Sequence, residues 1–233
     1  MKLKIAIPEN LSQITLGQYQ EYMKVLETNK GDENADDFLN MKALEIFCGL
    51  NLSECHQLPI KNFFFALEHI ERCFKEETPL IKSFSFKDPN GITQEMGFIP
   101  KLDDMSTGEY MDIDGYISDW SKMHRAMAVL YRPIRVKSGE NYTIQQYEGT
   151  DTYCDAMKEM PIGIVFGAMV FFYRLGMKLL RNIPQYLERQ KELSKTQKES
   201  LRKIGDGIHQ SSLYAEATFS KLMKPQKFLY TKA

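Results

Sequence analysis

The 233-residue sequence contains four cysteines and no pair of them at the CxxC spacing. This absence excludes the common zinc-ribbon and dithiol redox motifs, and it argues against a disulfide framework. The first ten residues, MKLKIAIPEN, also lack the long apolar run and small-residue cleavage site of a secretory signal. We therefore expect an intracellular protein that folds in a reducing compartment.

Long hydrophobic runs are missing as well. The longest apolar stretch covers residues 162–173, is interrupted by Gly163 and Gly167, and ends at Arg174. A membrane-spanning helix needs roughly 20 consecutive apolar residues, so this stretch is too short. It predicts a buried core helix that begins at Pro161, and no membrane partner.

Motifs of nucleotide and hydrolase chemistry are absent, since the sequence holds no GxxxxGK[ST], no GxGxxG and no GxSxG. The pair Cys55 and His56 and the pair His69 and Cys73 match no common zinc spacing. Cys73 lies among apolar residues and Cys55 falls in an expected short loop, which favours small buried side chains over metal ligands.

Two further patterns contain reactive or ligating side chains without completing a site. Coupling Cys55 or Cys154 to His124 as nucleophile and base needs a fold that the sequence does not indicate. The stretch DIDG at residues 112–115 resembles the start of a calcium loop, but position twelve of that loop falls on Met123 instead of a glutamate. The sequence thus predicts no enzyme activity, no cofactor and no metal ligands.

Charge is unevenly distributed, although the formal net charge is only −1. From Arg174 to the C-terminus, 13 lysines and arginines stand against 5 acids, a net of +8. Residues 88–119 hold eight acids and the single base Lys101, a net of −7. Nucleic acid is an alternative partner for the basic end, which we do not favour because the acids interrupt it. Opposite potentials of this size favour contact between the two regions in neighbouring molecules.

Most of the chain shows helical periodicity. Thr15 with Gln18, and Ser106 with Glu109, have the spacing of capping boxes, and Gly49 is placed as a helix stop. The pattern predicts helices that begin after Thr15, at residue 36, at residue 59, after Ser106 and at residue 161. It also predicts a helix over residues 118–131 that Pro133 terminates, and a helix that starts or kinks at Pro184.

Three segments alternate polar and apolar residues like strands. Residues 2–7 form the first, and residues 81–99 form a hairpin around the turn DPNG at residues 88–91. Residues 134–144 form a second hairpin. The predicted fold class is mainly α: a helical domain with one or two small β-hairpins and an extended C-terminal helical arm and tail. The expected division is a core domain over residues 1–182 and a basic arm and tail over residues 183–233.

Several stretches resemble a family of tailed-bacteriophage proteins. The likeness begins at ITLGQYQ (residues 14–20), includes GFIPKLDDMSTGEYMD (97–112), and continues through Trp120, MHRAMAVLYRPI (123–134), Met160-Pro161 and GAMVFFY (167–173). It covers most of the first 180 residues. The genes of this family lie among virion morphogenesis genes, so the resemblance implies a virion neck, tail or assembly role and brings no catalytic residues.

These observations predict a non-enzymatic structural protein of the virion, assembled in the host cytoplasm as a homo-oligomeric ring or head-tail connector. Its expected partners are other phage structural proteins of the portal, neck or tail. The open alternatives are a tail assembly chaperone that binds a tape-measure or tail protein and leaves the virion, and an enzyme of the infection cycle. The expected interface residues are the acids Asp103, Asp104, Glu109, Asp112 and Asp114, and the tail residues Phe228, Leu229 and Tyr230.

Overall fold

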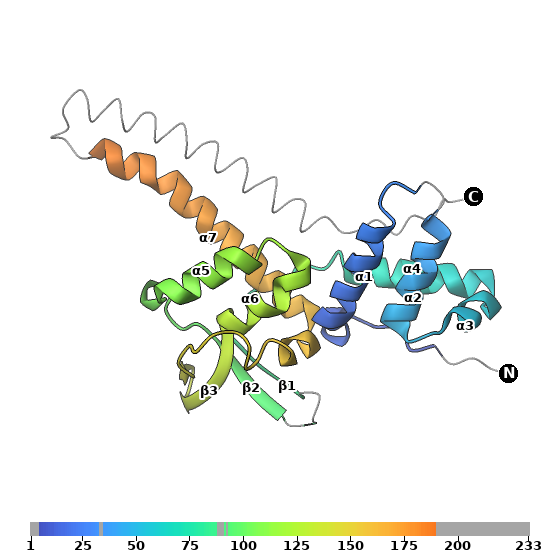
Figure 1. Ribbon diagram of the computed structural model, residues 1–233, viewed down its shortest axis with the longest axis horizontal. Helices are drawn as coiled ribbons and strands as arrows, with labels where there is room; N and C mark the ends of the chain where they lie inside the picture. Colours follow the sequence, from blue (N-terminus) through green and yellow to red (C-terminus); the bar gives the residue numbers. More distant parts are fainter. Residues whose placement is uncertain (1–4, 33–34, 88–90, 92, 190–233) are drawn as a thin grey trace. The chain divides into compact units, whose positions relative to one another are not determined.

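The computed structural model describes residues 5–32, 35–87, 91 and 93–189 of the chain (Figure 1). The chain divides into two compact units, of which one contains the described residues up to Gly167 and the other begins at Ala168. The expected boundary between residues 182 and 183 stays a prediction, because residues 190–233 lie outside the described residues.

The first unit opens with helices whose ends follow the sequence signals. They are α1 (Leu16–Thr28), α2 (Asp36–Cys48), α3 (Leu52–Gln57) and α4 (Ile60–Cys73). The capping box at the start of α1 is confirmed: Thr15 N–H donates to Gln18 Oε1 at 2.9 Å, and Gln18 N–H donates to Thr15 Oγ1 at 3.2 Å. Gly49 ends α2 with a φ of 69°, a left-handed conformation that glycine adopts without steric cost.

Helix α3 was not predicted, and the expected loop around Cys55 is wrong. A third capping box starts this short helix, because Asn51 and Glu54 exchange hydrogen bonds of 2.8 and 2.9 Å. Cys55 lies on the inner side of α3 and is buried, as are Cys48, Cys73 and Cys154, and all four are free thiols. The interpretation of Cys55 and Cys73 as small buried side chains is confirmed.

Both predicted hairpins are present, and they join into one antiparallel sheet in the order β1-β2-β3-β4. Its strands are β1 (Ser83–Lys87), β2 (Thr93–Phe98), β3 (Tyr131–Ser138) and β4 (Asn141–Ile144). The expected helix to Tyr131 ends one residue earlier, since Tyr131 pairs with Phe98 as the first residue of β3. Pro133 lies inside β3 opposite Met96 and does not terminate a helix. Figure 1 shows β1, β2 and β3 side by side.

Further elements differ from the predicted boundaries. The segment expected to begin with a cap at Ser118 is instead capped by Asp119, which starts the 3₁₀ turn η3 (Trp120–Lys122) before α6 (Met123–Leu130). Residues 5–7 form no strand, and residues 2–4 of the expected strand lie outside the described residues. Helix α7 (Ile162–Arg189) continues through Pro184, so no new helix starts there, and the alternative of a kink at Pro184 stays a prediction. Across the described ranges, no helix has both the length and the apolar character needed to cross a membrane.

Tyr19 of α1 lies at the centre of an aromatic cluster in the first unit. Its ring centroid is 4.7 Å from Trp120, 5.4 Å from Phe166 and 5.5 Å from Phe74. These rings come from α1, η3, the start of α7 and the residue after α4, so one cluster joins four distant segments. Tilted and edge-on contacts of this kind add to the stabilisation from burial.

Candidate functional site

Helix α5 (Thr107–Tyr116) contains the central part of the predicted acidic interface. Its start is fixed by the predicted capping box, in which Ser106 N–H donates to Glu109 Oε2 at 2.7 Å and Glu109 N–H donates to Ser106 Oγ at 3.3 Å. The second carboxylate oxygen of Glu109 accepts a hydrogen bond from the guanidinium of Arg132. Glu109 is 5% exposed and Arg132 is 7% exposed. Glu109, which was expected among the acids of the interface, is therefore a buried, ion-paired residue and not an exposed one.

Asp112 also faces inward in part. It is half-buried, and its Oδ2 accepts a hydrogen bond from the hydroxyl of Tyr147. The pKa of Tyr147 is raised mainly by burial, and to a smaller extent by this hydrogen bond to a carboxylate. The Tyr147 ring lies 5.6 Å from the guanidinium carbon of Arg132. Glu109 and Asp112 thus hold the inner side of α5 against β3 and the segment after β4.

The opposite side of α5 is exposed and partly apolar. Tyr110 is 63% exposed and Met111 is 67% exposed. Asp114, also exposed, lies four residues after Tyr110 and three after Met111, a spacing that places all three on one helical face. We call Tyr110, Met111 and Asp114 the α5 face.

The remaining predicted interface residues lie in the turn that precedes α5 or outside the described residues. Asp104 lies in the 3₁₀ turn η2 (Leu102–Asp104), with its side chain 73% exposed and 4.0 Å from the ammonium of Lys101. The backbone of Asp103 belongs to the same turn. The tail residues Phe228, Leu229 and Tyr230 lie outside the described residues.

A second exposed apolar surface lies on α4, and sequence reasoning missed it. Leu67 and Ile70 are buried on the inner side of α4, but Ile60 and Phe65 are 68% and 59% exposed. Phe63, Phe64 and Phe65 follow one another on a helix with about 3.6 residues per turn, so they cannot all face the core. The run of three phenylalanines was therefore the signal in the sequence for an exposed apolar surface on α4.

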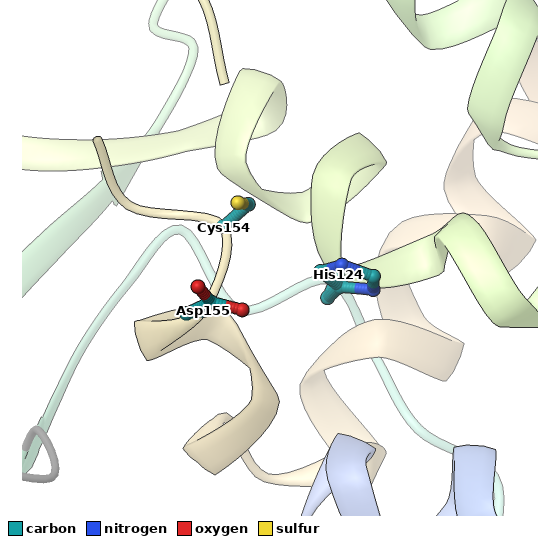
Figure 2. A group of neighbouring side chains, drawn as sticks. All are labelled: His124, Cys154 and Asp155. Carbon is teal, nitrogen blue, oxygen red and sulfur yellow. The ribbon is translucent and has the colours of Figure 1, made fainter. Parts of the chain in front are cut away.

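The structure also brings together three side chains that the sequence keeps apart. Figure 2 shows His124, from the first turn of α6, beside Cys154 and Asp155 of the segment that leads into η4 (Ala156–Glu159). One imidazole nitrogen of His124, the Cys154 thiol sulfur and one Asp155 carboxylate oxygen all lie within 4.8 Å of one another. His124 is half-buried, Cys154 is buried and Asp155 is exposed.

Charged groups surround this cluster, which we call the His124 cluster. The pKa of His124 is lowered mainly by burial, and to a smaller extent by the positive charges of Lys158 and Arg125. Lys158 Nζ lies 2.8 Å from Asp155 Oδ1, and Arg125 is held 2.8 Å from Asp151. Gln20 Nε2 donates to the carbonyl oxygen of Trp120 at 2.6 Å and lies 3.0 Å from His124 Nδ1.

The other cysteine and histidine pairs weighed in the sequence do not gather such a group among the described residues. Cys55 is buried and its neighbour His56 is exposed. The Cys73 thiol donates to the carbonyl oxygen of Pro8 at 3.4 Å, while His69 Nδ1 lies 2.7 Å from an Arg72 guanidinium nitrogen. Of the two couplings to His124 considered in the sequence, the structure supports proximity only for Cys154.

Comparison of the chain with protein-family models, with curated proteins and with solved structures finds no match.

Proposed function

We propose that the chain is a non-enzymatic structural component of a tailed-bacteriophage particle, assembled as a neck or tail ring or head-tail connector. The sequence resemblance supports the setting, and the α5 face supports a role in protein–protein contact. In this proposal the C-terminal arm and tail, residues 183–233, extend to the α5 face of the neighbouring copy or to a portal, neck or tail protein.

The α5 face is the observation that carries the proposal. Two large apolar side chains, Tyr110 and Met111, are more than 60% exposed on a helix with no base, and the exposed acid Asp114 lies on the same face. Burying a side chain of this kind contributes about 1.5–3 kcal/mol. An apolar surface that includes an exposed acid is suited to a partner that is apolar and basic.

The C-terminal tail has that complementary chemistry. Phe228, Leu229 and Tyr230 are consecutive, the nearby lysines are Lys224, Lys227 and Lys232, and no acid follows Glu216. Exposed ion pairs each contribute only about 0–1 kcal/mol, so the apolar residues provide most of the binding energy. The charges steer the encounter and fix the register.

The test compares two double variants of the full-length chain by sedimentation velocity. Tyr110→Ser with Met111→Ser removes the apolar part of the α5 face, whereas Ile60→Ser with Phe65→Ser removes a similar exposed surface on α4. We expect the first variant to reduce the oligomer to smaller species and the second to leave it unchanged. Equal effects of the two variants would contradict the assignment of the α5 face.

Removal of residues 225–233 should reproduce the effect of the α5 variant. Raising the salt concentration should weaken the oligomer without abolishing it, because only the charged part of the contact is screened. If the truncation has no effect and salt alone dissociates the oligomer, the contact is electrostatic, as a nucleic-acid-facing arm would be.

A tail assembly chaperone would use the same face to hold a tape-measure or tail protein. Mass spectrometry of purified virions distinguishes the two roles. A ring or connector is present in the particle in a fixed ratio to other structural proteins, whereas a chaperone is absent from it.

A further inference from the structure

We propose that His124, Cys154 and Asp155 form a binding site for a zinc-class divalent transition metal. The three residues offer an imidazole nitrogen, a thiolate and a carboxylate oxygen, all within 4.8 Å of one another. The site is independent of the α5 face and of the proposed assembly role.

The ligand types select the metal. Thiolate and imidazole are ligands of Zn²⁺ and related transition metals, while Ca²⁺ and Mg²⁺ take oxygen ligands almost exclusively. Three protein ligands leave the fourth tetrahedral position to water. Bonds of about 2.0–2.3 Å in a tetrahedral site place ligand atoms roughly 3.6 Å apart, so binding needs to draw any two of these atoms together by no more than about 1 Å.

Backbone hydrogen bonds fix the positions of two of the ligands, Cys154 and Asp155. Cys154 N–H donates to Thr150 O at 3.0 Å, and Lys158 N–H donates to Asp155 O at 3.2 Å. At the far end of the segment, Leu16 N–H donates to Met160 O at 2.8 Å, which ties η4 to α1. The largest adjustment on binding therefore falls to side chains, and the Asp155 side chain, 82% exposed, has room to turn once its ion pair with Lys158 is broken.

The charges around the cluster decide its affinity. A metal needs an unprotonated imidazole nitrogen, and burial together with the positive charges of Lys158 and Arg125 disfavours the protonated ring of His124. Lys158 opposes binding, since its ammonium lies 2.8 Å from the carboxylate that the metal would take. Arg125 opposes it less, because Asp151 offsets the Arg125 charge at 2.8 Å.

Substitution of Lys158 tests the site in a second way, because it should raise the metal affinity, whereas removal of a ligand should lower it. Lys158→Gln removes the competing ammonium and keeps the Cβ, which lies on the side of Gly17 in α1. A metal site at this cluster must therefore bind more tightly in Lys158→Gln. A site elsewhere on the chain would not respond.

The experiment titrates the full-length, chelator-treated chain with Co²⁺, whose bond to a thiolate gives a charge-transfer absorption in the near ultraviolet. We expect one Co²⁺ per chain, displaced by Zn²⁺. Cys154→Ser should remove the charge-transfer band, and Asp155→Asn should weaken binding by at least the roughly 10-fold that outer-shell changes cause at metal sites. Lys158→Gln should tighten it.

Cys73→Ser is the matched control. Like Cys154, Cys73 is almost fully buried and its thiol donates to a backbone carbonyl, but it lies outside the cluster. The control should keep the band, and circular dichroism of each variant shows whether it has folded. The proposal is overturned if the folded wild-type chain gives no thiolate band, if Cys154→Ser retains it, or if Lys158→Gln weakens binding.

Discussion

The guanidinium of Arg132 donates to the carboxylate of Glu109 inside the protein, and both side chains are less than a tenth exposed. The pair connects β3 to the first turn of α5, where the same carboxylate also accepts from the backbone of Ser106. Tyr110 and Met111 directly follow Glu109 in α5. By fixing Glu109 on the inner side of the helix, the buried pair sets the orientation of the α5 face.

Arg132→Met should lower the free energy of unfolding strongly. The substitution leaves the Glu109 carboxylate buried without its cation, and breaking a buried pair in this way costs about 3–5 kcal/mol. Urea denaturation followed by circular dichroism measures the change. The control is Lys137→Met on the same strand, which breaks the exposed pair of Lys137 with Glu95 and should cost less than about 1 kcal/mol. Similar costs for the two variants would show that Glu109 tolerates an unpaired charge.

Gly167→Ala and Gly115→Ala should change stability in opposite directions, although both replace a helical glycine. A Cβ at Gly167 would lie 2.2 Å from the backbone oxygen of Pro79, which cannot move aside as a flexible side chain could. We expect a loss of about 1–3 kcal/mol from this overpacking. A Cβ at Gly115 meets nothing within 4 Å, so alanine should add about 0.5–1 kcal/mol through its higher helix propensity. A thermal unfolding series of the two variants measures both changes, and equal shifts would contradict the close approach at Gly167.

The elements predicted correctly are those whose signals are local. Thr15 with Gln18 and Ser106 with Glu109 start helices because the capping groups lie three residues apart, and Gly49 stops a helix through its own backbone conformation. The same signal at Asn51 was available in the sequence and was overlooked. Helix starts and stops of this kind are readable from sequence because their energetics involve neighbouring residues only.

Other errors occur where distant residues decide the structure. Tyr131 continues a helical stripe in sequence, but its pairing with Phe98 and the hydrogen bond from its hydroxyl to Ile81 O at 2.8 Å place it in the sheet. The His124 cluster could not be predicted as a group, since 30 residues separate His124 from Cys154 and only the packing of α6 against η4 brings them together. Tertiary contacts of this kind leave no local pattern.

Asp119 should stabilise the protein in a pH-dependent way. It accepts hydrogen bonds from the Ser121 hydroxyl at 2.7 Å and the Ser121 N–H at 2.9 Å. The side-chain hydrogen bond from Ser121 is the main reason that the pKa of Asp119 lies below its ordinary value of 3.8. Because the folded-state pKa is lowered, this contribution is present above pH 3.8 and is lost as the pH falls through the lowered pKa.

Asp119→Asn keeps an oxygen acceptor and removes the charge, so it isolates the pH-dependent part. We expect the wild type to be more stable than this variant at pH 7, and the difference to shrink in acid below pH 3.8. Asp119→Ala also removes the cap and should cost about 1 kcal/mol at pH 7. Urea midpoints at several pH values measure these differences. A difference between wild type and Asp119→Asn that is constant with pH would contradict the assignment.

Asp114→Asn should stabilise the isolated protein and weaken its assembly. Asp114 lies in the last turn of α5, which contains no basic residue, and a negative charge near a helix C-terminus is disfavoured by the helix dipole. Removing that charge should raise the free energy of unfolding of the monomer by about 0.3 kcal/mol or slightly more. In the proposed assembly, a lysine of a neighbouring tail offsets the same unfavourable charge, so the variant loses a contact that the wild type gains. Denaturation of the dilute monomer and sedimentation at assembly concentrations measure the two effects separately.

Asp36→Asn is the control, because Asp36 lies in the first turn of α2, where the dipole favours an acid. That substitution should lower monomer stability and leave assembly unchanged. If Asp114→Asn weakens neither the oligomer nor its salt dependence, Asp114 does not belong to the interface.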